Sequence, residues 1–166
     1  MLLNTSITIV NFSENTALRN WIVTNDTVMG GGSRSTIHWD ERGFGVFSGF
    51  VSTANNGGFS MVRLPVNVAL NASFQNIKLK VKGDGKKYEF RIKSSNSQRH
   101  WYVQSFQTSG EWEEITLKLK DFYPSFRGYK LQQANFSDDT IREIALLIGN
   151  KVDEDFKLMI DSIDLK

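Results

Sequence analysis

The sequence predicts a single all-β domain, a β-sandwich or barrel with one or two short helices. Three observations indicate this class. Apolar and polar residues alternate with period two in many segments, Gly- and Asn-rich turns separate these segments, and helical patterns are scarce. A chain of 166 residues is the size of one domain, so residues 1–166 are treated as one unit.

Two segments show the alternation most clearly. Residues 77–82 alternate aliphatic side chains with three lysines, and residues 88–93 alternate Tyr, Phe and Ile with charged residues. The Gly-Asp-Gly turn between them predicts a β-hairpin. Residues 144–148 are apolar throughout, which is typical of a strand buried on both faces. Further strands are expected over residues 5–10, 34–39, 44–52, 58–64, 100–106, 115–119 and 156–160.

Helical and strand-breaking signals are few. Ser13 is a candidate N-cap for a short helix over residues 14–20, and Ser137 is a candidate cap for a single turn through residue 140. Pro65 and Pro124 are expected just beyond strand ends, because proline cannot donate to a strand ladder.

The sequence lacks the residues and motifs that several kinds of catalytic and metal-binding site require. The chain has no cysteine, which excludes disulfides, thiolate zinc sites and thiol nucleophiles. His38 and His100 form no metal-binding pair, and no Gly-x-Ser-x-Gly motif is present. The glycines of residues 30–33 are not followed by the Lys-Ser/Thr of a phosphate-binding loop, and Glu111 and Glu113 flank a hairpin edge. We therefore expect no enzymatic activity and no catalytic residue.

Charge and hydropathy limit the partners. The net charge is only +2, with basic and acidic residues interspersed, so no nucleic-acid partner is expected. A basic sheet face is the one feature that favours nucleic acid, and its residues are Lys78, Lys80, Lys82, Arg91 and Lys93. No aromatic stacking pattern accompanies it. No apolar run approaches the roughly 20 residues of a membrane span, so no membrane insertion is expected. The first ten residues lack the pattern of a signal peptide, and a cytoplasmic location is expected.

Ordered motifs run along nearly the whole chain. Residues 21–33 read WIVTNDTVMGGGS, residues 47–52 read FSGFVS, and residues 55–63 read NNGGFSMVR. Shorter motifs follow in the same order at residues 82–88 (KGDGKKY), 110–112 (GEW), 122–128 (FYPSFRG) and 156–163 (FKLMIDSI). Together they resemble the complex I intermediate-associated protein 30 family, and the likeness includes its stand-alone bacterial members.

The resemblance implies a fold and a class of function. It implies a jelly-roll β-sandwich of the galactose-binding-domain-like class, akin to carbohydrate-binding modules. Mitochondrial members of the family assist the assembly of respiratory complex I, so the resemblance implies a protein client and a chaperone-like, assembly-factor role. The alternative is a carbohydrate or small-ligand binding module. The sequence leaves the oligomeric state open.

The candidate binding residues lie within or near the motifs. Asp26, Asn56 and Arg63 would form either a polar pocket at one end of the sandwich or a structural network between loops. Whether Asp26 and Arg63 meet is open. Arg91, Trp101 and Tyr102 are candidates for sugar binding, together with Trp39 and Gln104, and Arg127 is a further candidate within its motif.

No cofactor is expected apart from a structural Ca²⁺, which jelly-roll modules of this kind often hold. Its candidate ligands are Asp153, Asp155 and Asp161, whose carboxylates are of the type that Ca²⁺ prefers. Ordinary turn and surface positions are the alternative interpretation of these three acids.

Overall fold

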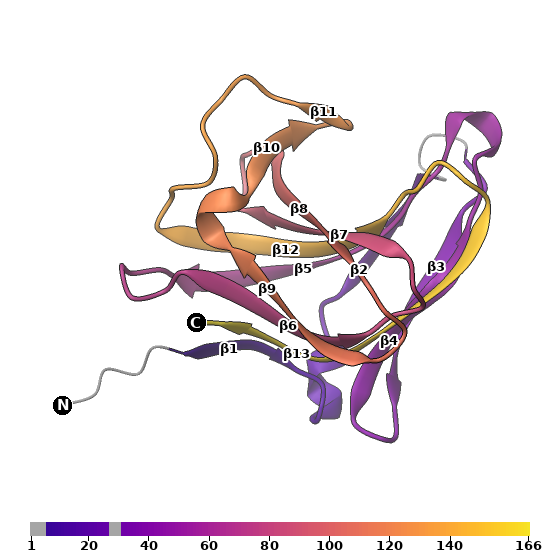
Figure 1. The fold of residues 1–166 in the computed structure, drawn as a ribbon, viewed down its shortest axis with the longest axis horizontal. Helices are drawn as coiled ribbons and strands as arrows, with labels where there is room; N and C mark the ends of the chain where they lie inside the picture. Colours follow the sequence, from indigo (N-terminus) through magenta and orange to yellow (C-terminus); the bar gives the residue numbers. More distant parts are fainter. Residues whose placement is uncertain (1–5, 27–30) are drawn as a thin grey trace.

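The computed structural model describes residues 6–26 and 31–166, except for the side chains of Asn15 and Asn56. Two antiparallel sheets face each other across one core (Figure 1). Sheet A has the order β3 (Arg34–Asp40), β4 (Phe44–Val51), β13 (Glu154–Leu165), β6 (Asn76–Lys82) and β9 (Trp112–Lys118), and β1 (Ile7–Asn11) pairs with β13. Sheet B has the order β11 (Tyr129–Lys130), β10 (Tyr123–Phe126), β8 (Trp101–Gln107), β7 (Lys87–Lys93), β12 (Thr140–Ile148), β5 (Ser60–Ala69) and β2 (Ile22–Asn25).

The core forms from the inward faces of both sheets, as period-two alternation requires. The aliphatic side chains of β6 in sheet A and the Tyr, Phe and Ile of β7 in sheet B are at most 1% exposed. Phe47 of β4 packs edge-to-face on Phe156 of β13, with ring centroids 4.9 Å apart. Phe156 also packs edge-to-face on Tyr88 of sheet B, with ring centroids 6.4 Å apart, and so joins the two layers. Burying each such side chain contributes roughly 1.5–3 kcal/mol.

The predicted hairpin between residues 77–82 and 88–93 is wrong. β6 pairs with β13 and β9 in sheet A, whereas β7 pairs with β12 and β8 in sheet B. The chain therefore crosses from one sheet to the other at residues 83–86. The alternation specifies only which side chains of each segment point into the core. β6 and β7 both point their apolar side chains into the same core, one from each sheet.

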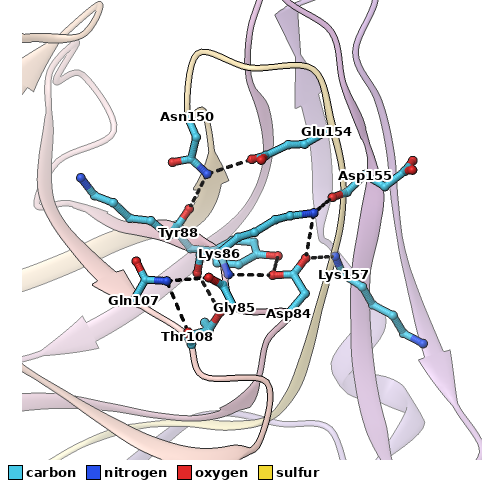
Figure 2. Close-up of polar contacts among 11 residues, drawn as sticks. Asp84, Gly85, Lys86, Tyr88, Gln107, Thr108, Asn150, Glu154, Asp155 and Lys157 are labelled. Atoms are coloured by element: carbon cyan, nitrogen blue, oxygen red, sulfur yellow. Dashed lines mark hydrogen bonds and ion pairs between the residues drawn. The ribbon is translucent and has the colours of Figure 1, made fainter.

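Asp84 ties the two sheets together at this crossing (Figure 2). Its Oδ1 accepts a hydrogen bond from the hydroxyl of Tyr88 in sheet B at 3.0 Å, and its Oδ2 accepts one from the backbone N–H of Lys157 in sheet A at 2.8 Å. Tyr88 is completely buried, and burial together with the neighbouring Asp84 carboxylate raises the pKa of its phenol. A Cβ at Gly83 would come within 2.2 Å of the Cβ of Thr108, so the crossing also requires glycine.

The helical predictions are largely wrong. The helix expected over residues 14–20 is a four-residue 3-10 turn, η1 (Asn15–Leu18), and its N-cap is Glu14, with no side-chain capping bond. Instead of capping, Ser13 donates its backbone N–H to Oδ1 of Asn11 at 3.0 Å. The turn expected after Ser137 is absent, because β12 begins at Thr140.

Further short 3-10 turns are η3 (Ala54–Asn56) and η4 (Leu119–Asp121). Within the described ranges, no helix has the length and hydropathy needed to cross a membrane.

Both prolines lie inside strands, contrary to the prediction. Pro65 of β5 stands opposite Glu143 beside a β-bulge, at a point where β2 no longer covers the other side of β5. Pro124 lies in β10, which pairs with the two-residue β11 on its outer side. Proline is tolerated in strands at edges and bulges, where its missing N–H costs no ladder bond, and these positions have that character.

Candidate functional site

Sheet B has an apolar cluster on its outer side, away from the core. We call this side the outer B face. Its buried members are Met61, Trp101, Val103, Ala145 and Leu147, and Phe59 and Tyr123 pack against them. All five buried members are at most 9% exposed. Burial of this degree is unusual on the side of an antiparallel sheet that no second layer covers.

Two ion pairs lie among the members of this cluster. Arg63 of β5 lies opposite Ala145, and Ala145 lies opposite Arg91 of β7 in the next strand. Nη1 of Arg63 is 2.8 Å from Oε2 of Glu143, and Nη2 of Arg91 is 2.7 Å from Oε2 of Glu89. The side chains of Arg91 and Glu143 are only 15% and 12% exposed. The charged groups therefore screen the apolar surface from water and are themselves partly desolvated.

Two lysines lie over aromatic rings of the same face. Nζ of Lys93 is 4.4 Å from the ring centroid of Trp101, and Nζ of Lys130 is 5.5 Å from that of Tyr123. Such cation–π contacts are typically worth about 0.5–1 kcal/mol at exposed positions. Burial lowers the pKa of Lys93, and the nearby Glu143 carboxylate offsets this only in part. Burial also raises the pKa of Tyr123.

Asp26, the most conspicuous sequence candidate, is the centre of a separate and closed hydrogen-bond network. Its carboxylate accepts bonds from the backbone N–H and the hydroxyl of Ser33, at 3.0 and 2.6 Å, and from the N–H groups of Gly58 and Phe59, at 2.5 and 3.3 Å. The side chain is 1% exposed. Burial alone would raise its pKa, but the four hydrogen bonds outweigh burial, and the pKa is lowered. Asp26 thus joins two loops to the end of sheet B as a permanent carboxylate.

Two glycines make this close approach possible. A Cβ at Gly57 would lie 2.4 Å from Oδ2 of Asp26, and a Cβ at Gly31 would lie 2.4 Å from Oδ1. The glycines of the family-like motifs therefore provide space for one carboxylate. Met29 and Gly30 of the same motif lie outside the described residues.

Asp26 and Arg63 do not share a site. Arg63 bonds to Glu143 and, through Nε at 3.3 Å, to Oγ1 of Thr24, whereas the Asp26 carboxylate bonds to Ser33 and to backbone N–H groups. The structural network weighed for these residues is therefore the arrangement observed around Asp26. The side chain of Asn56 lies outside the described part of the chain.

The other sequence candidates are distributed over different surfaces. Arg91 and Trp101 belong to the outer B face, as described above. Tyr102 points to the opposite side of sheet B, where its ring packs edge-to-face on Phe136 at 5.3 Å. Arg127 lies at the tip of the β10–β11 hairpin with a φ of 51°, and its guanidinium covers Phe126.

The three aspartates proposed as Ca²⁺ ligands are not brought together. Oδ1 of Asp153 accepts bonds from the backbone and the hydroxyl of Thr53, at 2.7 and 2.8 Å. These bonds lower the pKa of Asp153. Asp155 and Asp161 lie six residues apart on β13, a distance of about 20 Å along a strand. In the described residues, no three acidic or histidine side chains gather as a metal site would require.

The lysines considered as one basic sheet face belong to two faces. Lys78 and Lys80 project from β6 on the outer side of sheet A, where they pair with Glu114 at 3.1 Å and Asp161 at 3.8 Å. Arg91 and Lys93 project from β7 in sheet B. A continuous basic face made of all five residues is therefore wrong.

Sequence reasoning missed most of the outer B face. Tyr123, Glu89 and Glu143 were not singled out as site residues, and Lys93 was named only as part of a basic sheet face. The continuous apolar run of residues 144–148 was the available signal, because it predicted burial on both sides of β12, and this is confirmed. Burial on both sides of β12 implies that side chains of adjacent strands cover its outward residues.

Comparison with known proteins identifies the family. The sequence profile of the complex I intermediate-associated protein 30 family matches residues 10–160. The chain belongs to the complex I intermediate-associated protein 30 family. Among curated relatives, the probable mitochondrial complex I intermediate-associated protein 30 of Caenorhabditis elegans and that of Caenorhabditis briggsae are each 27% identical over 147 residues. The match covers 74% of this chain and 43% of each relative, so the chain spans less than half of their length.

Solved structures agree with the sandwich fold of this family member. The family 11 carbohydrate-binding module of Clostridium thermocellum, solved with a β-1,3-1,4-mixed-linked tetrasaccharide, has a TM-score of 0.70 and 19% identity, covering 95% of this chain and 94% of the module. The agarase AgWH50C has a TM-score of 0.64 and 11% identity, covering 97% of this chain and 24% of the enzyme. The predicted galactose-binding-like jelly roll is confirmed.

Proposed function

We propose that this chain is a non-catalytic binding domain that holds a protein client on the outer B face during the assembly of respiratory complex I. Family membership and the names of the two nematode relatives support the assembly role. The observation that supports the location is the buried apolar cluster together with the two ion pairs that lie among its members. Met, Trp, Tyr and Arg side chains, which make up much of this face, are residue types enriched in protein interfaces.

The hydrogen-bonded and ion-paired side chains described above support a non-catalytic role. The Asp26 carboxylate is fixed by four hydrogen bonds, and its lowered pKa leaves it no proton to donate near neutral pH. Arg63 and Arg91 are each occupied by a glutamate. A general acid or base must be open to its substrate, whereas these three side chains are held by partners within the protein.

A carbohydrate ligand is the second candidate. Trp101 and Tyr123 lie on one sheet face, and the fold is that of carbohydrate-binding modules. However, Trp101 is 9% exposed and Lys93 lies over its ring, so little aromatic surface is open for a sugar to stack on. Protein binding is therefore the better supported function.

Site-specific photo-crosslinking tests the proposal. Ser105 is exposed on the outer B face, where it lies opposite Glu89. With a photo-reactive residue at Ser105, we expect crosslinks to a complex I subunit or assembly intermediate in the host, identified by mass spectrometry. The matched control is Thr116, which is exposed on the outer side of sheet A opposite Lys78.

The control decides between the two sheets. Crosslinks from Ser105 but not from Thr116 are the expected result. Equal crosslinking from both positions, or complex I subunits captured from Thr116 alone, would contradict the location. If no complex I component is captured at either position, the assembly role is wrong. A neutral glucan that binds in affinity electrophoresis and blocks the Ser105 crosslinks would favour the carbohydrate alternative.

A further inference from the structure

The outer B face contains two ammonium groups without a carboxylate partner. Glu89 and Glu143 are already paired with Arg91 and Arg63. Lys93 and Lys130 form no ion pair with any described residue, and each lies over an aromatic ring. These six side chains comprise four basic and two acidic groups, so this group has an excess of two positive charges. Both excess charges are on the side where Trp101 and Tyr123 lie.

The strand register aligns the two lysines. Lys93 of β7 lies opposite Glu143 of β12. On its other side, Ile92 pairs with Tyr102 of β8, so the next position along places Lys93 opposite Trp101. Trp101 lies opposite Ser125, and Ser125 lies opposite Lys130. Lys93 and Lys130 therefore occupy one row across the sheet, three strands apart. With about 4.8 Å between strands, their backbone positions are about 14 Å apart.

This spacing matches an extended peptide that runs across the strands. In an extended chain, side chains i, i+2 and i+4 point to the same side, and positions i and i+4 are about 14 Å apart. Acidic side chains at i and i+4 would reach the two ammonium groups once the lysine side chains, which lie over Trp101 and Tyr123, extend outward. An apolar side chain at i+2 would then pack on the aromatic surface that the two ammonium groups leave.

We infer that the outer B face binds an extended acidic segment of the client with the pattern acidic-x-apolar-x-acidic, its two carboxylates pairing with Lys93 and Lys130. This inference rests on the proposed function, because it names the chemistry of the client held there. Lys93 is already partly desolvated by its burial, which Glu143 offsets only in part, so a carboxylate that arrives adds charge compensation. Its ammonium moves from the face of the indole ring toward the carboxylate.

Two peptides of identical composition test the spacing. The blocked peptide Ser-Glu-Thr-Leu-Thr-Glu-Ser places its glutamates about 14 Å apart, and Ser-Thr-Glu-Leu-Glu-Thr-Ser places them about 7 Å apart. By isothermal titration calorimetry with the whole chain, we expect the first peptide to bind more tightly, with an affinity that falls as salt is added. Lys93→Ala and Lys130→Ala are each expected to weaken it about tenfold. Lys78→Ala, on the outer side of sheet A, is the matched control and leaves binding unchanged.

Each result decides the inference. Equal affinity for the two peptides, equal loss with Lys78→Ala, or no binding of either peptide would overturn it. Because Lys130 is exposed on a hairpin, Lys130→Ala remains informative if Lys93→Ala disturbs the packing of Trp101. If an oligogalacturonate binds and Lys93→Ala weakens it, while neither peptide binds, the face binds an acidic polysaccharide. That result would overturn the inference of an acidic peptide ligand. If Ser105 crosslinks a complex I component but neither peptide binds, this inference fails while the proposed function stands.

Discussion

Asp26→Ala is expected to lower the free energy of unfolding by about 4 kcal/mol, because four buried donors lose their acceptor at once. For a domain of this size, the melting temperature should fall by about 10 °C. Asp26→Asn should also destabilise, since its amide nitrogen presents hydrogens to groups that themselves donate. Chemical denaturation followed by circular dichroism measures both. Asp153→Ala is the control, an exposed aspartate with two hydrogen bonds, and we expect little change in its unfolding midpoint.

The contribution of Asp26 should also depend on pH. Its pKa is lower in the folded protein than its ordinary value of 3.8. The stabilisation is therefore complete above about pH 5, and it is lost as pH falls through 3.8 toward the folded-state pKa. The stability difference between the wild type and Asp26→Asn should shrink over that interval. A difference that stays constant down to pH 2 would show that the charge of this carboxylate is not what the two loops require.

Asp84→Ala is expected to cost about 2–3 kcal/mol, since it leaves the buried hydroxyl of Tyr88 and the backbone N–H of Lys157 without their acceptor. Tyr88→Phe removes the hydroxyl instead and should cost about 1 kcal/mol. The double variant should cost less than the sum, because the orphaned hydroxyl is then gone. Denaturant unfolding of the four proteins completes the cycle.

The matched control for this cluster is Asp155→Ala. Asp155 lies beside Asp84, and its backbone carbonyl, which accepts a hydrogen bond from the Lys86 ammonium, survives the substitution (Figure 2). We expect Asp155→Ala to unfold at nearly the wild-type denaturant concentration. If it destabilises as strongly as Asp84→Ala, general loss of negative charge at this end explains the effect, and a specific link between the sheets does not.

The strands were predictable where one face is apolar and the other polar. Residues 77–82 and 88–93 show this pattern, and it correctly assigns their inward side chains. The pattern carries no information on which strands pair with each other, and for this reason the predicted hairpin was wrong. β2 and β10 are four residues long, too short for periodicity to appear, and neither was predicted. Pro124 argued further against a strand at β10, although an edge position accommodates it.

The candidate site was less predictable than the fold. Trp101 and Arg91 were named from the sequence, but the burial of Val103 and Ala145 depends on charged side chains from neighbouring strands. The partner of Arg63 is Glu143, 80 residues away, a separation that no local pattern specifies. The cytoplasmic location, the bacterial source and the calcium site stay predictions from the sequence.

The position of β13 has a consequence for folding. This strand lies between β6 on one side and β4 and β1 on the other. While the chain is being synthesised, β3 with β4 and β6 with β9 are separate pieces of sheet A until residues 154–165 emerge. Partners so distant in sequence must close large loops before they gain any contact, which makes such topologies slow to fold. The unpaired edges of β4 and β6 are exposed to neighbouring chains during that interval, so we expect refolding yield to fall steeply as protein concentration rises.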